Sequence, residues 1–215
     1  YSQMPSHGGE LMLPALAAGG LYGMDLVTAY HPYSLHPEGD DPAAMDFVQR
    51  ARQGNAALRA AGAGQIWADE WGWSSYAGPV EEQPLIGQQG QADYLLRRLA
   101  LMAALDYDKT FVFALSDLDT RASVRDRSYG LLDLQGEPKP AYLALQRLLA
   151  LTGPRLLPGQ APRLAQAPEG LVGVGWRRPD GQRLWMYWAS QPAVIAVDRI
   201  STAVLHDPLG GTQQT

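Results

Sequence analysis

The hydrophobic positions between residues 10 and 151 follow two alternating spacings. Apolar side chains recur at helical spacing in four segments: 10–18, 42–61, 88–105 and 139–151. Three short and almost continuously apolar runs, which predict buried strands, separate these helices: 25–33, 65–73 and 109–116. Apolar strands that alternate with helices are typical of a parallel sheet covered by helices. The pattern predicts an α/β fold, as half of a (β/α)8 barrel or as part of an open doubly wound sheet.

The pattern changes after residue 152. Prolines interrupt the chain at four positions: 154, 158, 162 and 168. Two strand-like runs, 171–176 and 183–189, then flank the turn sequence Pro179-Asp180-Gly181. This arrangement is typical of antiparallel strands. We therefore predict two domains, an α/β domain over residues 1–152 and a small β-rich domain, of β-sandwich type, over residues 153–215.

Composition and charge narrow the range of functions. A hydrophobic content of 46% with 18% charged residues is that of a packed protein rather than a disordered one. The net charge of −5, with scattered Lys and Arg, provides no basic face for nucleic acid. No apolar run approaches the roughly 20 residues that span a bilayer. The chain has no cysteine, and its four histidines lack metal-ligand spacing, so we predict no metal or cofactor.

The strand predicted at 65–73 carries a carboxylate, Glu70, near its C-terminal end. Barrel enzymes assemble their active sites at that end of the strands. Glutamate is also depleted in strands, so its presence there needs a reason. The sequence alone leaves two interpretations open: Glu70 is a catalytic carboxylate, or it is simply the first solvated residue after the strand.

His31 and Tyr33 favour the catalytic interpretation. They lie two residues apart at the end of the preceding strand, so in extended backbone both side chains leave the same face. An imidazole and a phenol beside Glu70 can hold its carboxylate ionised and orient it. The alternative for Tyr33 is a buried tyrosine whose hydroxyl bonds to backbone.

Four further side chains at the same rim are candidates for substrate binding. Trp71 and Trp73 flank Glu70, and indole faces form platforms for the C–H surfaces of sugars. Asp117 and Asp119 follow the strand predicted at 109–116 and can bond sugar hydroxyls. The alternatives are core packing for each tryptophan and loop capping for each aspartate.

Four sequence motifs in this order resemble a known enzyme class. They are His-Pro-Tyr at 31–33, Trp-Ala-Asp-Glu-Trp-Gly at 67–72, Tyr-Gly-Leu-Leu at 129–132 and Pro-Lys-Pro-Ala-Tyr at 138–142. Together, over residues 10–150, they resemble the last strands and helices of clan A glycoside hydrolases. The resemblance is strongest to the family 39-like bacterial exopolysaccharide hydrolases, with family 5 as a near relative. It implies the C-terminal half of a (β/α)8 TIM barrel followed by a small antiparallel β domain.

The resemblance also implies a reaction, which is retaining hydrolysis of a poly- or oligosaccharide. In such families the position of Glu70 supplies the nucleophile from the seventh strand, and His31 and Tyr33 match the pair that orients it. The acid/base glutamate follows an asparagine on the fourth strand, about 5–5.5 Å from the nucleophile. No Asn-Glu pair occurs here, and the only asparagine, Asn55, lies in a predicted helix.

We therefore expect the chain to begin within a longer protein. The N-terminal half of the barrel, in the same longer chain or in a separate chain, would supply the acid/base. Polysaccharide hydrolases of this kind imply a periplasmic or extracellular location. The main alternative function is a non-catalytic carbohydrate-binding or scaffold protein with the same barrel.

Overall fold

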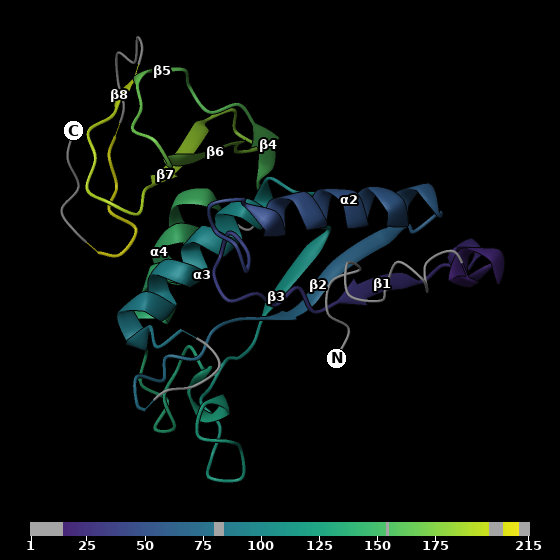
Figure 1. The fold of residues 1–215 in the computed structure, drawn as a ribbon, viewed down its shortest axis with the longest axis horizontal. Helices are drawn as coiled ribbons and strands as arrows, with labels where there is room; N and C mark the ends of the chain where they lie inside the picture. The colour runs from purple at the N-terminus through teal and green to yellow at the C-terminus, as the bar shows by residue number, and fades with distance from the viewer. Residues whose placement is uncertain (1–14, 80–83, 154, 198–203, 211–215) are drawn as a thin grey trace.

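Three parallel strands form the sheet on which the candidate site lies. The computed structural model describes residues 15–79, 84–153, 155–197 and 204–210. The strands lie side by side in the order β1 (Val27–Tyr30), β2 (Gln65–Trp71) and β3 (Lys109–Val112) (Figure 1). Helix α2 (Asp46–Ala60) connects β1 to β2, α3 (Gly87–Ala103) connects β2 to β3, and α4 (Pro140–Thr152) follows β3. Two short 3-10 turns are η1 (Leu21–Gly23) and η2 (Asp126–Ser128). The predicted alternation of helices with a parallel sheet is confirmed.

The strands are shorter than the apolar runs that predicted them. β1 ends at Tyr30, the last of its residues paired with β2, so His31 and Tyr33 belong to the loop that follows. β3 ends at Val112, where its pairing with β2 also ends. Beyond β3 the Phe113 amide still donates to the Trp71 carbonyl at 2.8 Å, but the next amide, that of Ala114, donates to the Tyr129 carbonyl instead of to β2. The helix predicted at 10–18 is observed at residues 15–18 and turns at Gly20 (φ 76°), while residues 10–14 lie outside the described residues.

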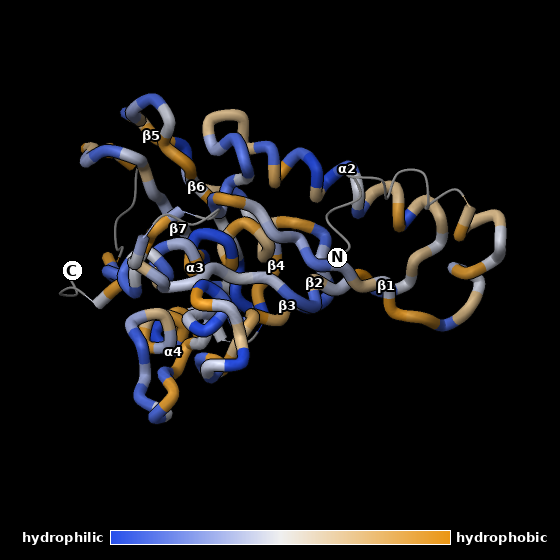
Figure 2. Tube along the Cα trace, turned by 60° about the horizontal axis from the view of Figure 1, so that its bottom comes forward, coloured by the Kyte–Doolittle hydropathy of each residue, from blue (hydrophilic) through white to orange (hydrophobic). Residues whose placement is uncertain are grey.

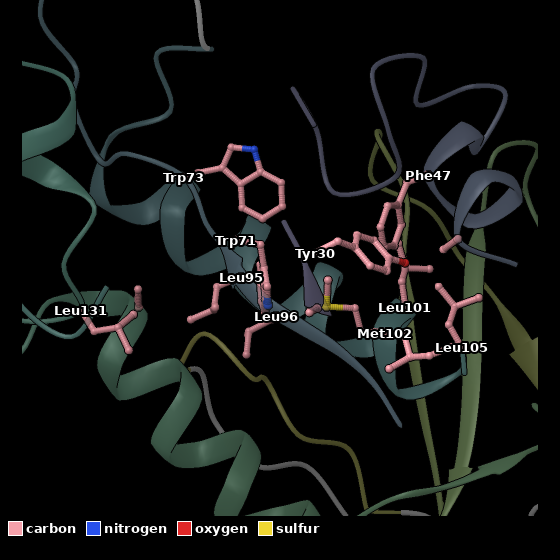
Figure 3. Close-up of a cluster of buried hydrophobic side chains, with 14 of the residues drawn as sticks. Tyr30, Phe47, Trp71, Trp73, Leu95, Leu96, Leu101, Met102, Leu105 and Leu131 are labelled. Carbon is pink, nitrogen blue, oxygen red and sulfur yellow. The ribbon is translucent and has the colours of Figure 1, made fainter. Parts of the chain in front are cut away.

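The hydrophobic core lies between one face of the sheet and the helices. Ile66 and Ala68 of β2 are fully buried on that face. Figure 3 shows Trp71 beside Leu95 and Leu96 of α3, within the same buried cluster. In Figure 2 the trace of α2 alternates between hydrophilic and hydrophobic residues, as expected for a helix with one buried side. Each buried aliphatic or aromatic side chain of this kind contributes about 1.5–3 kcal/mol to folding.

The other face of the sheet carries exposed apolar side chains. Val27 of β1 is 42% exposed and Phe111 of β3 is 45% exposed. Between them, Trp67 of β2 is half-buried and packs on Phe111, with ring centroids 5.5 Å apart. We call Val27, Trp67 and Phe111 the open face of the sheet. Exposed apolar side chains on a parallel sheet are typical of a surface that another element covers.

The C-terminal part is antiparallel β structure, as predicted. β6 (Val172–Arg177) pairs with β7 (Arg183–Trp188) on one side and with β4 (Leu157–Gly159) on the other. β5 (Leu164–Gln166) pairs with β8 (Ala196–Val197) in a separate two-stranded sheet. β6 and β7 pack onto the core through half-buried side chains that include Val174 and Met186. The two parts of the chain therefore share one continuous apolar cluster.

No helix among the described residues has the length and apolar character needed to cross a membrane.

Candidate active site

A β-bulge on β2 determines where Glu70 points. Ala68 pairs with Thr110 and Trp71 pairs with Val112, so β2 uses three residue steps where β3 uses two. Without the bulge, strict alternation would place Glu70 on the same buried face as Ala68. With it, Trp71 takes the buried position at 0% exposure, and the Glu70 side chain remains 34% exposed on the open side. Bulges commonly re-aim side chains next to functional sites.

The structure brings Glu70, Tyr33 and His31 together. The Tyr33 hydroxyl donates a hydrogen bond of 3.0 Å to Oε1 of Glu70. His31 Nδ1 lies 3.8 Å from the same oxygen. Both neighbours come from the loop after β1, so the ends of two adjacent parallel strands build this group. The hydrogen bond from Tyr33 fixes the direction of the Glu70 carboxylate, a group that can act as a nucleophile.

Asp69 also belongs to this group, although the sequence analysis did not assign it. Its Oδ1 lies 3.5 Å from His31 Nε2, and its side chain is 38% exposed. Strand alternation predicts that Asp69 and Glu70 point to opposite faces, which concealed this proximity. The bulge brings both carboxylates to the same imidazole.

Two aromatic rings extend the group toward the loops after β3. Tyr129 packs edge-on against Tyr33, with ring centroids 6.5 Å apart, and Phe113 packs against Tyr129 at 5.5 Å. The peptide bond from Phe113 to Ala114 is cis. Gly72 lets the backbone of Phe113 lie close to the end of β2, because a Cβ at position 72 would clash with the Phe113 carbonyl oxygen. Tyr129 lies in the Tyr-Gly-Leu-Leu motif, which was the only sequence signal for it.

Gln91 of α3 ties the backbone beneath these rings together. Its buried Nε2 donates to the Trp73 carbonyl at 2.9 Å and to the Tyr129 carbonyl at 3.1 Å. A single amide therefore joins the chain after β2 to the segment that carries Tyr129. Such buried side-chain bonds to backbone restrict the positions of both loops.

Trp71 and Trp73 do not form the predicted stacking platform. They are 0% and 3% exposed, so neither offers a ring face to a sugar. The Trp71 indole nitrogen donates to the Thr110 hydroxyl, and that of Trp73 donates to the Ser34 carbonyl at 2.9 Å. The bulge turned Trp71 inward, and Trp73 anchors the loop after β1. Both roles are structural, which corrects the sequence-based assignment.

Asp117 and Asp119 are engaged in loop contacts. Asp117 Oδ1 accepts from Nζ of the buried Lys139 at 2.9 Å and from the Gly130 amide at 2.8 Å, which fixes the loop to the start of α4. Asp119 pairs with Arg121, whose hydrogen bonds lower the pKa of that carboxyl. These contacts agree with the capping interpretation, and contact of either aspartate with a sugar stays a prediction.

A buried arginine holds the loop that carries His31 and Tyr33. The Arg98 guanidinium, on α3, is fully buried and lies over the Phe47 ring, 3.5 Å from its centroid. It donates to four groups of the loop, namely the carbonyls of Pro32 (2.7 Å), Pro37 (2.9 Å) and His36 (3.1 Å) and the Ser34 hydroxyl. Burial lowers the pKa of Arg98 to about 9. The loop conformation therefore depends on one side chain of a neighbouring helix.

The antiparallel part of the chain contacts the same loop. Glu38, 3% exposed, accepts bonds of 2.6 and 2.7 Å from Nη2 of Arg97. Trp188 of β7 donates to the same carboxylate at 2.7 Å. A buried carboxylate requires such partners, because an unpaired charge in the interior is costly. The far end of the chain thus supports the loop after β1.

Among the described residues, no group of three or more His, Asp or Glu side chains has the geometry of a metal site.

Comparison with known proteins identifies similar folds. No protein-family model matches the sequence, and no curated protein matches it. A family 39 glycoside hydrolase from the gut symbiont Bacteroides cellulosilyticus WH2 superposes with a TM-score of 0.60 and 20% identity over 86% of this chain. Two β-glucuronidases also match. The one from Faecalibacterium prausnitzii has a TM-score of 0.47 and 17% identity, over 60% of this chain and 22% of its own. The one from Dictyoglomus thermophilum has a TM-score of 0.45 and 16% identity, over 58% of this chain and 22% of its own.

The match is to part of a longer protein, since this chain covers 38% of the family 39 enzyme. The resemblance to glycoside hydrolases that the motifs predicted is thus confirmed at the level of the fold. At 20% identity the superposition establishes a shared fold and leaves the chemistry to the site itself. The chain has the fold of part of a family 39 glycoside hydrolase.

Proposed function

We propose that this chain is part of a retaining glycoside hydrolase in which Glu70 is the nucleophile. One observation carries the proposal: a half-exposed carboxylate at the C-terminal end of a parallel strand accepts a 3.0 Å hydrogen bond from Tyr33. The position is the one that barrel enzymes use for catalysis. The hydrogen bond holds Oε1 of Glu70 in place, and the exposure of the side chain leaves it accessible to a substrate.

The proposed reaction is a double displacement. The Glu70 carboxylate attacks the anomeric carbon as the glycosidic bond breaks, and the departing oxygen takes a proton from an acid. Water, deprotonated by that same group acting as base, then hydrolyses the glycosyl ester and regenerates Glu70. Tyr33 and His31 both lie at Oε1, which leaves Oε2 as the attacking oxygen.

The acid/base is proposed to lie in the remaining part of the barrel, in the same longer chain or in a separate one. A retaining mechanism requires a second carboxyl group about 5–5.5 Å from the nucleophile. The proposed substrate is a poly- or oligosaccharide, and the proposed location is periplasmic or extracellular.

The proposal is tested with Glu70→Gln in the complete protein. Turnover of an aryl glycoside should fall by roughly 10³-fold or more. Asp25→Asn is a matched control for the loss of a surface charge. Asp25 is exposed and lies just before the N-terminal end of β1, whereas the Glu70 site lies beyond its C-terminal end. Turnover by Glu70→Gln at the level of the control would reject Glu70 as the nucleophile.

A second measurement separates a nucleophile from an acid. Glu70→Ala with added azide should give a glycosyl azide of the opposite anomeric configuration to the substrate, because azide attacks from the face that the carboxylate vacates. An azide product with the substrate's own configuration would instead assign Glu70 as the acid/base. If the unmodified complete protein binds but never cleaves glycosides, it is a carbohydrate-binding protein.

A further inference from the structure

Asp69 is an exposed carboxylate next to a proposed nucleophile, and its position has an identifiable cause. The bulge between Ala68 and Trp71 brings Asp69 and Glu70 toward the same ring. Two carboxylates on one side of a strand repel each other, and each disfavours the ionised form of the other. A nucleophile must be ionised to attack. A neighbouring aspartate therefore hinders Glu70 unless something lies between them.

The imidazole of His31 occupies that position. Nε2 lies 3.5 Å from Asp69 Oδ1, and Nδ1 of the same ring lies 3.8 Å from Glu70 Oε1. The two nitrogens of the ring therefore face different carboxylates. The edge of the Tyr33 ring packs against the imidazole, with centroids 6.5 Å apart, so the ring has a neighbour on a third side.

The partner of one imidazole nitrogen determines what the other nitrogen does. A carboxylate that faces Nε2 fixes the orientation of the ring, and with it the direction in which Nδ1 points. We propose that Asp69 is a positioning residue for the glycosidase reaction, acting through His31 to hold Nδ1 toward Glu70.

This inference rests on the proposed role of Glu70 and adds a residue that acts indirectly. A surface ion pair at these exposures, 32% for His31 and 38% for Asp69, contributes little to folding. The expected effect is therefore on the reaction rather than on stability. That difference makes the proposal distinguishable from a merely structural role.

The test is a double-mutant cycle in the complete protein with an aryl glycoside that it hydrolyses. Asp69→Ala should lower kcat by about 10-fold with little change in KM, because the loss of one contact of hydrogen-bond strength corresponds to about this factor. Asp69→Asn should recover part of the loss, since its amide oxygen can face Nε2 from the same position. His31→Ala combined with Asp69→Ala should be no slower than His31→Ala alone, because Asp69 has no route to Glu70 once the ring is gone.

A second readout does not depend on activity. The ¹⁵N chemical shifts of the His31 ring, assigned by their loss in His31→Ala, should change in Asp69→Ala. They should stay unchanged in the exposed control Asp25→Asn, which removes the same charge before the start of β1. Thermal unfolding of each variant identifies any loss of fold.

Additive losses in the cycle, or His31 shifts that Asp69→Ala leaves unchanged, would overturn the proposal. Its failure is separate from that of the proposed function. If Glu70 takes no part in the reaction, Glu70→Gln retains activity whatever the cycle shows, and if Glu70 is the acid/base, the azide product keeps the configuration of the substrate. If only the role of Asp69 is wrong, Glu70→Gln is inactive and the cycle is additive.

Discussion

At the scale of single residues, the Glu70 carboxylate has two neighbours, Tyr33 and His31, whose contacts with it differ in strength. The Tyr33 hydroxyl donates to Oε1 at 3.0 Å, whereas His31 Nδ1 lies 3.8 Å from the same oxygen, beyond hydrogen-bonding distance. A hydrogen bond to a charged group contributes about 1.5–3 kcal/mol. Tyr33 is therefore expected to be the stronger determinant of the state and direction of the carboxylate.

Tyr33→Phe should lower kcat by about 10–100-fold, which corresponds to the loss of one hydrogen bond to a carboxylate. KM should change little if the bond supports the attacking group rather than the bound sugar. Steady-state kinetics on an aryl glycoside measures both constants. Tyr142→Phe, which removes a half-buried hydroxyl on α4, is the matched control. Equal kcat values for the two variants would show that the Tyr33 hydroxyl has no part in the reaction.

At the scale of elements, hydrogen bonds from helix α3 hold the loop after β1 in its conformation. Arg98 donates to three carbonyls and one hydroxyl of this loop, and its guanidinium lies against Phe47. A planar fork with five donors suits this geometry, whereas a lysine ammonium cannot reach several carbonyls at once. The loop that carries Tyr33 thus has a specific requirement for arginine.

Arg98→Lys should reduce the free energy of unfolding of the complete protein by about 2–4 kcal/mol, because buried carbonyls lose their donors at about 1–3 kcal/mol each. Denaturant unfolding measures the loss, and kcat should fall with it as the loop relaxes. The exposed Arg52→Lys on α2 provides the matched control. A stability equal to that of the control would mean that other contacts order the loop.

The helices and strands of the site could be predicted from the sequence, whereas the pairing between β2 and β3 could not. The helices, the strands and the meeting of Glu70 with Tyr33 follow from apolar periodicity and from the rule that parallel strands end at one edge. The bulge does not, because it depends on how β2 registers with β3, some 40 residues away along the chain. The extra residue of the bulge explains why the sequence predicted a substrate contact for Trp71 and no role for Asp69.

At the scale of the whole molecule, the two faces of the parallel sheet differ sharply. One face is packed under α2 and α3, and the open face presents Val27 and Phe111 at 42% and 45% exposure. Parallel sheets occur almost only with both faces covered. The family 39 enzyme that shares this fold is much longer, since this chain covers 38% of it. These observations support the proposal that further barrel strands cover the open face.

Residues 1–215 produced alone should therefore self-associate through the open face. Val27→Thr with Phe111→Thr should reduce this association, because both changes remove apolar surface while threonine retains a high strand propensity. Light scattering coupled to size-exclusion chromatography measures the mass. Leu134→Thr with Val194→Thr is the matched control, since these residues are 57% and 78% exposed outside the sheet. A monomer with cooperative unfolding would show instead that the open face needs no cover, and would remove this support for a missing part of the barrel.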